Sequence, residues 1–238
     1  ALMQLQPWRL WTKAADGTVT PADEHVKTAA AVLDAALAAP GGMRHAALLH
    51  LQCHMHELAA SPAHAAPAAD ALRSLFDSSG HLLHMASHID VWQGRFNDAV
   101  DANVRAVAAD DAHVARVGID ANFFTFYRLH NALFVVWLAM MSGRKKDALQ
   151  YAAKVDAAMV VGTRDTLGVT LELFDGAVKF GSMYLEAFTM AKWCVWVRFG
   201  MWQEILAAPR DEYSDVSMWP CGAAFAAYAR GVAHAACG

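Results

Sequence analysis

The chain has 238 residues, of which 56% are hydrophobic and 18% charged, so it can bury a sizeable core. Its formal net charge of −4 comes without basic clusters, which argues against nucleic acid or an anionic membrane surface as partner. No stretch stays apolar for the roughly 18 residues that a membrane-spanning helix needs, so no membrane span is predicted.

Strand signals are nearly absent, because Ala, Leu and Met recur at helical spacing while alternating β-branched runs are missing. The sequence therefore predicts an all-α fold. The predicted helices cover residues 21–38, 43–60, 63–76, 80–93, 95–109, 121–142, 144–160, 180–199 and 217–236. Pro21 with the acidic residues Asp23 and Glu24 suits the first turn of a helix. The segment 161–179 has no clear period, and we expect it to be irregular.

Three segments place a glycine between two predicted helices, with the second helix beginning within a few residues. These glycines are Gly94, Gly143 and Gly200. The pattern resembles the tetratricopeptide repeat, whose GxYxxA core is matched best by Gly94, Phe96 and Ala99. The glycines lie further apart than the about 34 residues of a regular tandem array, so the repeats must be elongated or separated by insertions. We expect close helix contacts at the small residues Ala99, Ala106, Ala148 and Ala152.

A closer resemblance covers nearly the whole chain through six ordered motifs. They are ALMQLQPWRLW, HLQCHMHE, GHLLHMASHI, YRLHN, RFGMWQEIL and YARGVAHAACG. In this order they resemble a group of tetratricopeptide-repeat proteins of bacteria and some algae. The resemblance implies a right-handed superhelical solenoid of antiparallel helix pairs, with residues 1–238 as a single helical repeat domain. It draws attention to the histidines but implies no reaction.

Histidines are concentrated on two of the predicted helices. One helix presents His50, His54 and Glu57, and the other presents His81, His84 and His88. Residues spaced three or four apart share one helix face, so each set points in one direction. Because a single antiparallel helix separates the two, we expect them to lie side by side as first helices of successive pairs. We expect His56 to lie off this face and His64 to be exposed.

The next predicted helix, 121–142, adds Tyr127 and His130 three residues apart. Imidazole is the commonest side-chain metal ligand, and Glu57 would offset the charge of a divalent cation. The seven residues predicted as metal ligands are His50, His54, Glu57, His81, His84, His88 and His130. They exceed the needs of one tetrahedral zinc ion, which leaves a dinuclear site or a mononuclear site among further histidines.

Iron, copper and zinc all suit an imidazole-rich site, and the sequence does not separate them. With iron or copper, we expect an oxidative reaction on a small molecule held in the concave groove, with Tyr127 as candidate proton donor. The alternative is a metal-free polar groove or simple packing of the histidines. In that case the chain is a scaffold for a peptide, a partner protein or a second copy of itself.

The four cysteines are far apart and form no CxxC pair. They are Cys53, Cys194, Cys221 and Cys237. This spacing indicates neither a zinc knuckle nor a disulfide framework, so we interpret the thiols as reduced and favour a cytoplasmic location. The chain begins at Ala1 and ends at a turn-like Gly238, and we expect it to be a fragment of a longer protein.

Overall fold

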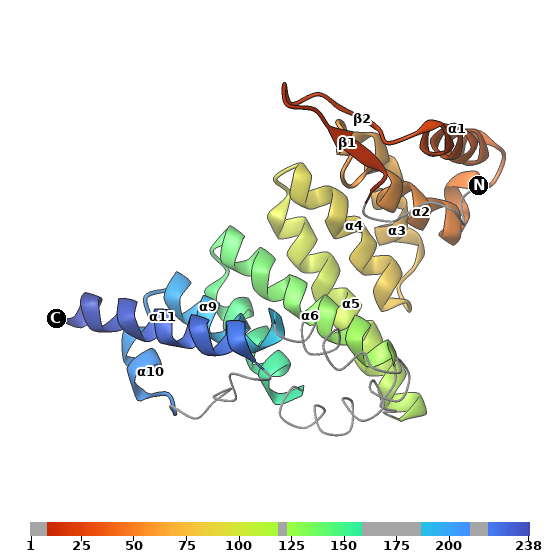
Figure 1. Ribbon diagram of the computed structural model, residues 1–238. Helices are drawn as coiled ribbons and strands as arrows, with labels where there is room; N and C mark the ends of the chain where they lie inside the picture. Colours follow the sequence, from red (N-terminus) through yellow and green to blue (C-terminus); the bar gives the residue numbers. More distant parts are fainter. Residues whose placement is uncertain (1–8, 119–122, 159–186, 210–218) are drawn as a thin grey trace, which may run out of the picture. The chain divides into compact units, whose positions relative to one another are not determined.

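The computed structural model describes residues 9–118, 123–158, 187–209 and 219–238. Their regular structure is almost entirely helical, as predicted (Figure 1). The chain divides into two compact units, Ala1–His113 and Val114–Gly238. Within the described ranges, no helix combines the length and apolar character needed to cross a bilayer. The segment 161–179, expected to be irregular, lies outside the described residues.

The described part of the first unit contains four α-helices, two short 3-10 helices and most of a fifth α-helix, α5, whose last four residues belong to the second unit. They are α1 (Glu24–Ala38), η2 (Gly42–Arg44), α2 (Ala46–His56), η3 (Pro62–Ala65), α3 (Ala66–Leu75), α4 (Gly80–Trp92) and α5 (Phe96–Val117). These bounds agree with the predicted helices to within a few residues, except that α5 continues well past residue 109. The Asp23 side chain caps α1 by accepting a hydrogen bond from the Val26 N–H at 3.0 Å.

A small β-hairpin precedes α1 and was not predicted from the sequence. Its strands β1 (Trp11–Lys13) and β2 (Val19–Pro21) pair antiparallel, with Thr12 opposite Thr20. The Trp11 indole N–H donates to the carbonyl oxygen of Met55 at 2.6 Å, which fastens the hairpin to the end of α2. Three-residue strands are too short to show an alternating pattern, which is why periodicity did not reveal them.

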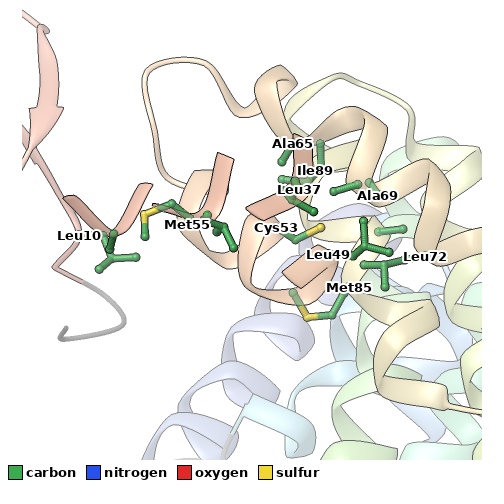
Figure 2. Close-up of a cluster of buried hydrophobic side chains, with 14 of the residues drawn as sticks. Leu10, Leu37, Leu49, Cys53, Met55, Ala65, Ala69, Leu72, Met85 and Ile89 are labelled. Atoms are coloured by element: carbon green, nitrogen blue, oxygen red, sulfur yellow. The ribbon is translucent and has the colours of Figure 1, made fainter. Parts of the chain in front are cut away.

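The core of the first unit lies between α1, α2, α3 and α4. Figure 2 shows Leu49, Leu72 and Met85, which come from three different helices, packed together. All three side chains are fully buried. Burying an aliphatic side chain of this size contributes about 1.5–3 kcal/mol, so this cluster sets the spacing of the helices that carry the histidines.

The beginning of α4 lies very close to α5. A Cβ atom added at Gly80 would collide with the Asp110 carboxylate and the Ala106 carbonyl oxygen. Ala99 and Ala106 are fully buried on α5, as expected for small residues at close helix contacts. Glycine and alanine therefore let α4 approach α5 closely enough for their polar side chains to meet.

The second unit contains α6 (Phe123–Ser142), a helix over 145–158, α9 (Ala191–Arg198), α10 (Trp202–Ala207) and α11 (Pro220–Cys237). Trp193 is fully buried and packs with Ile205 and Ala229, so α9, α10 and α11 share one core. Ala148 and Ala152 are also buried, as expected.

The three turn glycines predicted from the repeat pattern all lie between helices. Gly94, Gly143 and Gly200 have φ values of 71°, 75° and 65°. This left-handed backbone favours glycine, because a Cβ atom is strained there. The helix-turn-helix pattern is thus confirmed locally at each glycine, whereas the superhelix itself stays a prediction.

An ion-pair network joins α3, α4 and the start of α5. The Asp90 side chain is fully buried and accepts from Arg73 Nη1 at 2.5 Å and from Arg95 Nε at 3.0 Å. Asp70 accepts from both arginines at the exposed edge. Burial raises the pKa of Asp90, and the two guanidinium groups oppose this effect. The network holds the last turn of α4 in register with both neighbouring helices.

Replacing Asp90 with alanine should destabilise the protein by about 1.5–3 kcal/mol, because Arg73 and Arg95 lose their bonds to the buried carboxylate and keep those to Asp70. The measurement is the free energy of unfolding from urea denaturation. Asp98→Ala is the matched control, since Asp98 is 59% exposed and lies 3.4 Å from the same Arg95. Its effect should stay below about 1 kcal/mol. Equal losses of unfolding free energy in Asp90→Ala and Asp98→Ala would contradict a structural role for the ion pairs of the buried Asp90.

Ala99→Leu should cost about 1–3 kcal/mol, because Ala99 is fully buried and a larger side chain overpacks the contact. The melting temperature should fall accordingly. An unchanged melt would show that α5 is not held at close distance at this position.

Candidate metal centre

Helix α2 positions the first set of histidines. His50 and His54 lie one turn apart on α2, and Glu57 follows directly as its C-cap residue with helical φ and ψ of −57° and −27°. The Glu57 side chain therefore continues the face that carries both imidazoles. Helix α4 contacts α2 directly, in agreement with the prediction that the two histidine-bearing helices lie side by side.

The histidine faces of α2 and α4 meet. His50 Nε2 and His81 Nε2 are 2.9 Å apart, with ring centroids separated by 5.0 Å. The His54 ring stands edge-on to His50 at 4.7 Å. One ring nitrogen from each of these three histidines lies within 4.8 Å of the other two, which is compact enough to hold a metal ion.

Glu57 connects the histidines of the two helices. One carboxylate oxygen lies 2.9 Å from His54 Nδ1, and the other lies 2.6 Å from His88 Nδ1. Burial acts to raise the pKa of Glu57, but the hydrogen bonds from His54 and His88 outweigh it and lower the pKa to about 2. The carboxylate is therefore ionised and can only accept, so both Nδ1 atoms carry the proton.

His84 is oriented from the other side by Asn103 on α5. The Asn103 amide nitrogen donates to the Ala99 carbonyl oxygen at 2.8 Å, so its oxygen must face His84 Nδ1, at 2.7 Å. An amide oxygen only accepts, and His84 therefore also carries its proton on Nδ1. Both His84 and Asn103 are completely buried.

These bonds leave His84 and His88 in an unusual contact. Their Nε2 atoms are 2.9 Å apart, yet in each neutral ring the proton is already on Nδ1. Two nitrogen lone pairs would then face one another, which is repulsive. A cation between them, either a proton or a metal ion, removes the conflict. Metal–nitrogen bonds of about 2.0–2.1 Å would separate two such ligands by roughly 3.3 Å, so only a small movement is needed.

Burial also keeps His50 and His81 neutral, and neutral imidazole is the form that binds metals. Burial is the main cause that lowers the pKa of both His50 and His81 to about 4, and neighbouring histidines add to it. Both rings are therefore neutral near pH 7, with a lone pair available on one nitrogen. A group of neutral imidazoles beside one ionised carboxylate is a donor set that suits zinc, copper and iron.

Two residues predicted for the site belong to the second unit. Tyr127 and His130 lie on α6, where the His130 ring packs 4.7 Å from that of Phe134 and Tyr127 is 39% exposed. The roles of His130 as a metal ligand and Tyr127 as a proton donor stay predictions from the sequence.

Sequence reasoning missed Asn103. It lies on the buried face of α5 together with Ala99, Ala106 and Asp110, at spacings of four, three and four. A polar residue at a core position of an alanine-rich helix is a signal that could have identified it, because a buried amide needs a partner.

Neither family models, nor curated proteins, nor solved structures give a match to this chain. The resemblance to tetratricopeptide-repeat proteins therefore stays a prediction. The function has to be inferred from the geometry of the site itself.

Glu57→Gln should weaken metal binding about 10–100-fold while preserving the shape of the side chain. The amide can accept from only one of His54 and His88, so its NH2 group forces the other ring to change tautomer or turn away. The measurement is the dissociation constant for Zn²⁺ by competition with a chromophoric chelator. Unchanged affinity would show that Glu57 does not orient these ligands.

Proposed function

We propose that the first unit binds two transition-metal ions between α2 and α4, at a site that we name the α2–α4 centre. Its ligands are His50, His54, His81, His84 and His88. The contact between His84 and His88 supports this most directly. Bonds from Asn103 and Glu57 direct both Nε2 atoms at one point, which a metal ion or a proton can occupy.

The ligands fall into two groups with one ion each. His50, His54 and His81 form the first group, whose ligand atoms lie within 4.8 Å of one another. His84 and His88 form the second, with water or a substrate completing the coordination. His54 and His88 belong to different groups, and the two oxygens of Glu57 hold one ring of each.

We assign Glu57 to orienting the imidazoles, although the sequence suggested it as a direct ligand. Both of its oxygens already accept from Nδ1 atoms, and such a carboxylate raises the basicity of a ligating histidine and fixes its ring.

The identity of the metal decides how far the function extends. With iron or copper, the centre would supply redox chemistry for a small molecule, whereas zinc would supply a Lewis acid. If the protein binds no transition metal, the scaffold function becomes the better account of the histidine-lined surface.

Protein prepared without a polyhistidine tag should contain at least about two equivalents of transition metal after supplementation and dialysis, measured by elemental analysis, and two of them should belong to the α2–α4 centre. The double substitution His84→Ala/His88→Ala should remove one of them, because losing two ligands costs more than the about 10–100-fold typical of an orienting residue. His50→Ala/His54→Ala should remove the other. The second pair is more exposed, so this variant tests binding even if loss of the buried His84 harms folding.

The matched control is His25→Ala/His45→Ala, which removes two exposed histidines of the same unit. It should keep the full metal content, and circular dichroism should show equal helix content in all variants. Trace metal in the wild type, or wild-type content in folded variants of both histidine pairs, would refute the α2–α4 centre.

A further inference from the structure

A second cluster of ligand-type side chains lies on the opposite side of α2, facing α1. Asp34 on α1, His56 at the end of α2 and His64 in η3 each place one ligand atom within 4.8 Å of the other two. The His56 and His64 rings are 4.6 Å apart, and His64 Nε2 is 3.0 Å from Asp34 Oδ1. None of these residues takes part in the α2–α4 centre.

Gln52 holds the carboxylate of this cluster. It lies one turn before His56 on α2, and its amide nitrogen donates to Asp34 Oδ1 at 2.9 Å. Burial acts to raise the pKa of Asp34, but the hydrogen bonds from His64 and Gln52 outweigh it, so the pKa lies below its ordinary value. The cluster therefore contains an ionised carboxylate beside two imidazoles.

Two buried polar atoms at the cluster lack a partner. His56 is only 7% exposed and Gln52 only 3%. Among the described residues, no group within hydrogen-bond distance pairs with His56 Nε2 or Gln52 Oε1. A buried polar atom without a partner is destabilising and calls for an explanation such as an ion or an ordered water.

We propose that Asp34, His56 and His64 form a separate metal site, here named the α1–α2 site, which takes a divalent ion of the zinc class. Two imidazoles and one carboxylate are the three protein ligands found at zinc ions that keep one position open for water. Gln52 orients Asp34 through its amide nitrogen, and its oxygen can accept from the water on the ion. The proposed site thus gives Asp34 a role as a ligand and gives the buried Gln52 oxygen a hydrogen-bond partner.

The cluster is also accessible to an ion. The side chains of Asp34 and His64 are 45% and 51% exposed, so they can turn by the small amount that coordination requires. His56 provides the rigid part of the site, since it is buried beside Trp11, with ring centroids 6.0 Å apart. One fixed ligand and two adjustable ones form an open site that solvent and a small ligand can reach.

The α1–α2 site can be tested with Asp34→Asn/His64→Ala in tag-free protein, by equilibrium dialysis against Zn²⁺ and by the visible spectrum with Co²⁺. Both residues are substantially exposed, so the variant should fold. It should bind one ion fewer than the wild type and lose the corresponding part of the Co²⁺ spectrum. Asp77→Asn/His25→Ala, which removes an exposed carboxylate and an exposed histidine of the same unit, should bind as the wild type does.

The possible outcomes separate this site from the α2–α4 centre. Loss of one ion in Asp34→Asn/His64→Ala, with the ions of the α2–α4 centre retained, supports the α1–α2 site. Equal stoichiometry in this variant and the wild type would overturn it, and an ordered water would then be the partner of the buried atoms. The α1–α2 site does not depend on the proposed function, because loss of an ion here is measured independently of the His84→Ala/His88→Ala variant.

Discussion

The Glu57 carboxylate is the constraint on which the candidate centre depends. It meets imidazoles from both α2 and α4, and its two oxygens fix the tautomers of His54 and His88. Asn103 does the same for His84 from α5. Because the Nδ1 positions are occupied, the Nε2 lone pairs are the atoms left for a cation. In the proposed α2–α4 centre, this orientation would make directed ligands of histidines that could otherwise be ordinary polar packing.

Helix α2 carries polar chemistry on two sides. In the stretch HLQCHMHE, His50 and His54 face α4, whereas Gln52 and His56 face the Asp34 side chain of α1. A two-residue step turns about 200° around a helix, so alternate residues of this stretch reach nearly opposite faces. Between them, Leu49 and Cys53 are fully buried in the hydrophobic cluster. Burial raises the pKa of the Cys53 thiol to about 12, so this cysteine is inert despite its neighbours.

The packing of α4 provides the positional accuracy that such a centre needs. At its beginning, Gly80 allows close approach to α5, and at its end Asp90 pairs with Arg73 and Arg95. Both ends of the histidine-bearing helix are thus tied to neighbours by contacts that tolerate little displacement. Ligand geometry must be held to within a fraction of an ångström to bind a metal well, and rigid helices do this better than loops.

The sequence by itself determined the helices, their glycine turns and the faces on which His50, His54, His81, His84 and His88 lie. These are local properties, because about 100° of rotation per residue decides which side chains share a face. Only the tertiary structure decided which atoms meet. The orienting role of Glu57, the bond between His84 and Asn103, and the approach of His64 to Asp34 join residues on different helices or across turns. Such contacts depend on how helices pack, which periodicity does not encode, and the three-residue strands of the hairpin are likewise stabilised by pairing and by the bond from Trp11 to α2.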